Sequence, residues 1–177
     1  QGGRSTGLEV SLDQAVGDLD WWASYTVARA TDRIGARHEA RSWDQRHAFQ
    51  GGVTWSDEHW TASIAGSIHS GWPATDLALE QSGTDPAGEP VYIAVPGPRN
   101  TLQHNTFASV DVRLSRQFEV KRGSLTAFLE ISNVLDRKNV CCVDWDTMDD
   151  INGNLVLERS DDYWLPLLPA VGILWEF

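Results

Sequence analysis

The sequence of 177 residues contains no uninterrupted apolar run long enough to form a membrane-spanning helix. The longest apolar stretch, Leu165–Trp175, is interrupted by two prolines, whereas a spanning helix needs about 20 consecutive apolar residues. This absence excludes helical membrane proteins. It does not exclude β-type membrane proteins, whose strands need only ~10 residues of alternating character.

Cysteine is scarce, since only Cys141 and Cys142 occur and they are adjacent in the chain. A disulfide between neighbouring residues would close a strained ring and would not join distant segments. The sequence therefore excludes a disulfide-stapled domain, and we interpret both thiols as loop residues.

Basic residues are outnumbered, with 14 Lys and Arg against 25 Asp and Glu and a formal charge of −11. Nucleic acid requires a basic face, so a nucleic-acid partner is not expected. The acids gather between Lys138 and Asp162, whereas Arg33, Arg37 and Arg41 make the 31–43 segment slightly basic. We interpret both segments as solvated loops.

Catalytic and metal-binding motifs are missing. The five histidines are scattered, and there is no HExxH pair, nucleophile elbow or phosphate loop. The acidic stretch 144–150 has Met148 where a calcium loop needs an oxygen ligand, and it has no glycine at the sixth place. We therefore predict no catalytic residue, no metal and no cofactor, and we interpret this stretch as a solvated loop with a hairpin turn at Asn152-Gly153.

Helical periodicity is weak throughout, whereas apolar and polar residues alternate with period two in seven segments. The segments are 8–13, 20–27, 44–55, 60–69, 108–118, 125–132 and 165–177. In the clearest one, Ala108, Val110 and Val112 alternate with Ser109 and Asp111. The pattern predicts an all-β, antiparallel fold.

The connections between these segments alternate in length. Those at 17–18, 57–58 and 121–123 are tight turns, whereas those at 31–43, 73–104 and 138–162 are long. Transmembrane β-barrels have short periplasmic turns on one rim and long extracellular loops on the other. We therefore predict an antiparallel transmembrane β-barrel segment of about seven strands, with the N-terminus on the loop side and the C-terminus on the periplasmic side.

Aromatic residues fall near the short turns and the C-terminus, as in the aromatic girdle of a membrane interface. These residues are Trp21, Trp55, Trp60, Phe118, Trp175 and Phe177. At the opposite strand ends, a second girdle is predicted from Trp43, Trp72, Tyr163 and Trp164. The alternative interpretation is that the aromatics fill the core of a soluble, ligand-binding β-sandwich.

An odd number of strands leaves open edges, which cannot face lipid because every unpaired backbone group costs free energy there. Either a strand lies unrecognised within the long loops, or the chain belongs to a larger barrel. The sequence begins with Gln and carries no signal segment, so we expect it to be part of a longer protein.

Several segments, taken in order, resemble the C-terminal region of TonB-dependent receptors, the outer-membrane barrels that import siderophores and other scarce nutrients. The resemblance covers nearly the whole chain. It is carried by the segments 42–47, 51–55, 70–73, 107–113, 130–139 and 165–177. The stretch Asn133-Val134-Leu135-Asp136 before a long loop, and a terminal strand ending in Phe177, are similar to features of that family. Pro166 and Pro169 depart from the family's pattern, and Pro169 predicts a bulge or a missing hydrogen bond.

The resemblance implies an outer-membrane location and contact with lipid. It also implies several partners: the remaining barrel strands and plug of a parent receptor, the TonB energy-transducing complex, and a nutrient such as a ferric siderophore. The plug domain, N-terminal in the family, is absent from residues 1–177. The rival interpretation is a passive or structural barrel without TonB coupling.

Ligand contacts are expected from the long loops and from polar residues that face the lumen, namely Arg46, Asp111, Arg113 and Glu130. Charged side chains inside large barrels commonly pair with each other or with a plug. We therefore interpret each of these four first as a structural residue and second as a ligand contact.

Overall fold

The computed structural model describes residues 2–151 and 154–177, so the predicted turn at Asn152-Gly153 lies outside the described residues. Throughout the described residues the regular structure is β, and every strand pair is antiparallel. This part of the chain contains no helix that is long and apolar enough to cross a membrane. The predicted all-β, antiparallel fold is confirmed.

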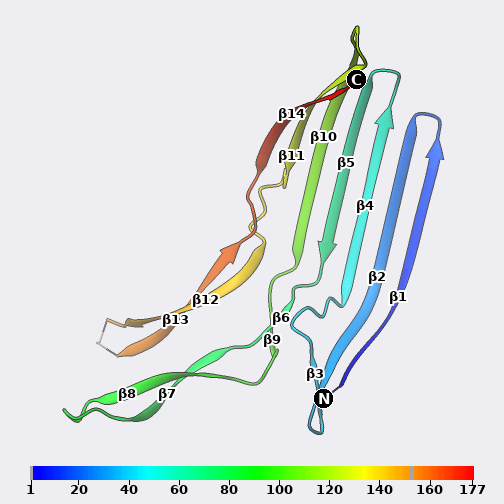
Figure 1. Ribbon diagram of the computed structural model, residues 1–177. Coiled ribbons are helices and arrows are strands. Elements are labelled where there is room, and N and C mark those ends of the chain that lie inside the picture. The colour runs from blue at the N-terminus through cyan, green and yellow to red at the C-terminus, as the bar shows by residue number, and fades with distance from the viewer. Residues whose placement is uncertain (1, 152–153) are drawn as a thin grey trace.

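Seven strands follow one another in a single meandering sheet (Figure 1). They are β1 (Gly2–Val16), β2 (Leu19–Ile34), β4 (His47–Ser56), β5 (Trp60–His69), β10 (Phe107–Glu119), β11 (Ser124–Ser132) and β14 (Leu168–Glu176). The short β3 (Arg37–Ala40) pairs with the far end of β2. Each strand overlaps one of the predicted segments, but β1 and β2 extend farther than the alternation indicated, and β14 begins after Leu167.

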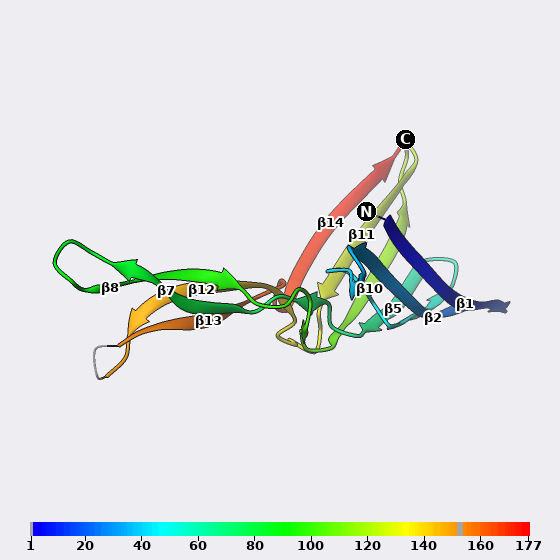
Figure 2. The ribbon, with the colours of Figure 1, turned by 90° about the horizontal axis from the view of Figure 1, so that it is seen from below.

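The sheet is open, with β1 and β14 as its two edges, and it does not close into a barrel. Figure 2 shows it curved, with the β1 and β14 edges on opposite arms. Pro169 was predicted to cause a bulge or a missing hydrogen bond; it pairs with Ile131 without a register shift, so the bulge is absent. Pro166 precedes the strand. An edge strand tolerates proline because one side of its backbone has no partner.

The long connections are not structureless, contrary to the prediction of solvated loops. They form the hairpins β7 (Leu77–Thr84) with β8 (Pro90–Pro96) and β12 (Val140–Asp149) with β13 (Leu155–Tyr163), and the short pair β6 (Pro73–Ala74) with β9 (Leu102–Gln103). The hairpins project away from the main sheet and add no strand to it (Figure 1). Most of their residues are exposed, and the alternation that marks a half-buried strand is confined to short stretches of β7 and β12.

The three short turns lie together with the C-terminus at one end of the sheet, and the hairpins and the N-terminus lie at the other (Figure 1). Gly17 has a φ of 61°, as required at the first position of a type II′ hairpin turn. In the turn at 57–59, the backbone N–H groups of Trp60 and His59 donate to the Asp57 carboxylate and lower its pKa. The predicted difference between the two rims is therefore present.

The pairing register separates the sheet into an apolar face and a polar face. In one row of cross-strand partners Trp21, Val53, Ile64, Val112 and Ile131 lie side by side. The adjacent row, displaced by one residue, consists of Asp20, Thr54, Ser63, Arg113 and Glu130. Because successive side chains of a strand point to opposite sides, these rows lie on opposite faces of the sheet.

Nothing in the described chain covers the apolar face. None of the described hydrophobic residues is buried, and Leu8, Val171 and Ile173 are 65%, 80% and 70% exposed. Burial of a Val, Leu or Ile side chain is worth about 1.5–3 kcal/mol, so a face made of such residues is unfavourable in water. Among residues 2–151 and 154–177, the main sheet forms a single layer, and no second sheet covers its apolar face as in a β-sandwich.

Five of the six predicted girdle aromatics project from the apolar face near the turn end. Trp21, Trp55, Trp60, Phe118 and Trp175 share this face by register, and Phe177 follows β14 and is 95% exposed. The second girdle was predicted from Trp43, Trp72, Tyr163 and Trp164. Two of its members, Trp72 and Trp164, line a pocket instead, because they lie beyond the strand ends, where alternation no longer sets side-chain direction.

Candidate ligand site at the loop end of the polar face

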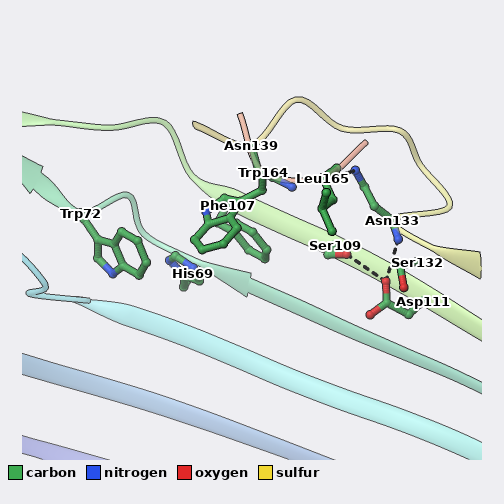
Figure 3. A pocket seen from close by; sticks show the side chains of 10 residues that line it. All are labelled: His69, Trp72, Phe107, Ser109, Asp111, Ser132, Asn133, Asn139, Trp164 and Leu165. Atoms are coloured by element: carbon green, nitrogen blue, oxygen red, sulfur yellow. Dashed lines mark hydrogen bonds between the residues drawn. The ribbon is translucent and has the colours of Figure 1, made fainter. Parts of the chain in front are cut away.

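An open pocket of about 340 Å³ lies where β5, β10 and β11 meet the long connections (Figure 3). Its aromatic wall is made by His69, Trp72, Phe107 and Trp164, and its polar wall includes Asp111 and Asn133. The residues come from segments far apart in the chain. The antiparallel register brings His69 opposite Phe107.

The aromatic wall is a stack centred on His69. Its ring lies 4.7 Å from the Phe107 ring at an interplanar angle of 6°, and 5.5 Å from the Trp72 ring at 25°. The His69 Nδ1 atom lies 2.9 Å from the Ser70 carbonyl oxygen. Gly71 makes the arrangement possible, because a Cβ at that position would collide with the His104 carbonyl group. The stack therefore presents a fixed apolar surface.

The polar wall is organised by Asp111. Its Oδ1 atom accepts hydrogen bonds from the Asn133 backbone N–H at 2.7 Å and from the Ser109 hydroxyl at 3.1 Å (Figure 3). The Asn133 side chain is buried and hydrogen-bonds to backbone groups of Arg137 and Leu165. Asp111 thus both stabilises the β11 exit and places a carboxylate in the pocket.

Asn139 attaches the start of the β12–β13 connection to β10. Its side chain accepts from the Ala108 N–H at 2.9 Å and donates to the Ala108 carbonyl oxygen at 2.8 Å, as a neighbouring strand would. Its own carbonyl oxygen accepts from the Trp164 N–H at 2.9 Å. These bonds bring Trp164 to the edge of the pocket.

This arrangement suits a ligand with a flat or apolar surface and a hydrogen-bond donor near Asp111. Across residues 2–151 and 154–177, no three His, Cys, Asp or Glu side chains are placed to hold a metal ion together.

The four residues predicted to contact ligand do not converge. Only Asp111 lines the pocket. Arg113 and Glu130 form an ion pair of 3.0 Å, and the Arg113 guanidinium lies 4.1 Å from the centre of the Phe128 ring. Arg46 donates to the buried Asp44 carboxylate at 2.7 Å, near the start of β4. Arg46, Arg113 and Glu130 thus form ion pairs, whereas Asp111 accepts hydrogen bonds from Ser109 and Asn133.

Sequence reasoning missed the aromatic wall as a site. A signal was present, because His69 and Phe107 occupy positions of the polar face at strand ends, where alternation predicts small polar residues. An aromatic residue at a position that belongs to the polar face indicates a local contact on that face.

The two cysteines are free and lie at a bulge in β12, where the register shifts between Val140 and Cys142. The Cys142 thiol, through a hydrogen bond, together with partial burial and the Asp162 charge, raises the pKa of Cys141 to about 11. Cys141 is therefore protonated at neutral pH and is a poor nucleophile.

Removing the neighbouring thiol should lower this pKa. We expect Cys142→Ala to speed the alkylation of Cys141 by iodoacetamide at mildly alkaline pH, because the thiolate fraction rises. The rate at Cys141 is measured by peptide mass spectrometry in wild type and variant. An unchanged Cys141 rate would show that the neighbouring thiol does not control its ionisation.

No protein-family model matches the sequence, and no curated protein or solved structure matches it either.

Proposed function

We propose that this chain is part of the β-barrel of an outer-membrane receptor that imports a scarce nutrient, a ferric siderophore, with energy supplied through TonB. The observation that carries the membrane part of the proposal is the continuous apolar face, which no other part of the described chain covers. Lipid is a surrounding in which such a face is stable.

The dimensions and the rims support the same proposal. The seven main strands contain 9 to 16 residues, and about 9–11 residues suffice for a tilted strand to cross a bilayer. Short turns gather at one end and hairpins at the other (Figure 1). The open edges at β1 and β14 require further strands to complete a barrel, and these would belong to the parent receptor.

The import part of the proposal is supported by the resemblance to TonB-dependent receptors and by the pocket. The pocket lies at the loop end of the polar face, which faces the lumen in the proposed barrel. A ligand that arrives through the extracellular loops would reach the Trp72, His69 and Phe107 stack there. The pocket thus offers a contact for a ligand with aromatic or apolar groups.

Uptake measurements test this proposal. In cells that express the full-length protein, we expect accumulation of radiolabelled iron supplied as a ferric siderophore, and we expect deletion of TonB to abolish it. Trp72→Ala should weaken uptake several-fold, mainly through a higher KM, because the substitution removes one ring from the stack. Uptake that persists without TonB would favour a passive barrel and would overturn the importer proposal.

A further inference from the structure

A group of basic side chains projects from the same side of the sheet as the apolar face, immediately beyond its last apolar pair. Leu8 pairs with Val27, and the next pairs of that face toward the loop end are Thr6 with Arg29 and Arg4 with Thr31. Since residues two apart in a strand share a face, Arg29 and Arg4 point outward with Leu8 and Val27.

The hairpin of β2 and β3 adds two more basic groups to this side. Arg33 pairs with His38. Because Arg33 follows Thr31 by two residues in β2, Arg33 and His38 lie on the same face as Thr31. We call Arg4, Arg29, Arg33 and His38 the outward basic cluster, and all four are exposed. Three of its members, together with Thr6 and Thr31, line a pocket of about 390 Å³.

No carboxylate neutralises this cluster. Among the described residues, no ion pair joins any of its members to an acid. The acids of the hairpin, Asp32 and Glu39, are partners in register and lie on the opposite face. There Asp32 binds Arg41 at 2.6 Å and Arg99 at 3.2 Å. The cluster is thus a local excess of positive charge in a chain of net charge −11.

We propose that the outward basic cluster binds the phosphate groups of the phosphorylated glycolipid that forms the outer leaflet of the outer membrane. This inference depends on the proposed function, since it requires lipid around the apolar face. The cluster lies where that face changes from apolar to polar at the loop end, and phosphates of the outer leaflet lie at this depth. Arginine suits them because its planar guanidinium donates two parallel hydrogen bonds to a phosphate.

The location of the threonines favours the same ligand. Thr6 and Thr31 lie in register beside Arg29 and Arg4, and both threonines line the same pocket. A phosphate there would receive donors from both residue types without requiring any carboxylate to move. Arg33, whose Nε atom donates to the Gly35 carbonyl oxygen at 3.3 Å, lines a different pocket, so Arg4, Arg29 and His38 are the members of the cluster that line the proposed phosphate pocket.

Native mass spectrometry tests this proposal with the full-length protein in dodecyl maltoside, a detergent without phosphate, and purified lipid A as the probe. We expect wild type to retain lipid A. Each arginine near a charged lipid surface contributes about a fivefold change in affinity, so Arg4→Gln with Arg29→Gln should weaken binding ~25-fold. Arg37→Gln is the matched control, because Arg37 belongs to the same hairpin but pairs with Ile34 and points to the opposite face.

Lipid A with its phosphates removed should bind as weakly to wild type as intact lipid A binds to the double variant. Equal binding of intact lipid A to wild type and to the double variant would overturn the proposal. So would complete displacement of lipid A by inorganic phosphate at equal concentration, which would indicate a site for the free anion.

The single variants decide the question if the double variant does not assemble. Recovery of wild type in the outer-membrane fraction without any lipid A binding would contradict this inference alone, whereas failure of wild type to enter that fraction would contradict the proposed function.

Discussion

Replacing Ile64 by lysine should prevent the protein from accumulating in the outer membrane. Ile64 lies near the middle of β5, is 49% exposed, and is flanked on the apolar face by Val53 and Val112. A lysine on the lipid face near the bilayer midplane costs about 2–4 kcal/mol. That penalty is a large part of the total stability of a typical domain. The amount of folded, heat-modifiable protein in the outer-membrane fraction is the measurement.

The next residue in the chain provides the matched control. Ala65 is exposed on the polar face, where it pairs with Gly52 and Asp111. Ala65→Lys therefore adds the same charge to the same strand, but near a carboxylate and in a watery lumen. We expect it to reach the outer membrane at the wild-type level. If the two variants accumulated equally, the apolar face would not be in contact with lipid.

The strands of the main sheet were predictable because each has one apolar and one polar face, and this difference appears in the sequence as alternation. In β10, Val112 and Leu114 alternate with Asp111 and Arg113, and the structure places the two pairs on opposite faces. Two of the three short turns, at 17–18 and 121–123, were predictable from their glycines. Gly123, with a φ of 92°, lies so close to the Glu176 carbonyl group that a Cβ would collide with it.

The hairpins and the pocket were not predictable for a common reason. The strands β7, β8, β12 and β13 are mostly exposed, and half-buried residues alternate with exposed ones only over short stretches, such as the one that contains Val143 and Trp145 in β12. The pocket depends on contacts between segments such as 69–72 and 164–165, whose proximity follows from the register of the sheet and from Asn139. Local sequence patterns do not contain that information.

Replacing Asn133 by alanine should strongly destabilise the protein. Asn133 is 5% exposed and has a φ of 49°. Its side-chain amide accepts from the Arg137 N–H at 3.1 Å and donates to the carbonyl oxygens of Arg137 at 3.0 Å and Leu165 at 3.2 Å. Each such hydrogen bond typically contributes about 0.5–1.5 kcal/mol to stability. We therefore expect Asn133→Ala to lower the free energy of unfolding by about 3–5 kcal/mol, since alanine is also disfavoured at positive φ.

Asn133→Gly separates the effect of the lost hydrogen bonds from the effect of the positive φ. Glycine also lacks the amide, but it adopts a positive φ without strain. It should be less harmful than Asn133→Ala by about 1 kcal/mol, the cost of the left-handed conformation for a residue with a Cβ. Urea titration of the full-length protein in lipid vesicles, followed by tryptophan fluorescence, measures both. If glycine restored wild-type stability, the amide hydrogen bonds would contribute nothing and backbone conformation alone would explain the residue. We expect the free energy of unfolding to be highest for wild type, lower for Asn133→Gly and lowest for Asn133→Ala. This ranking would show that the Asn133 side chain joins the end of β11 to the segment that leads into β14.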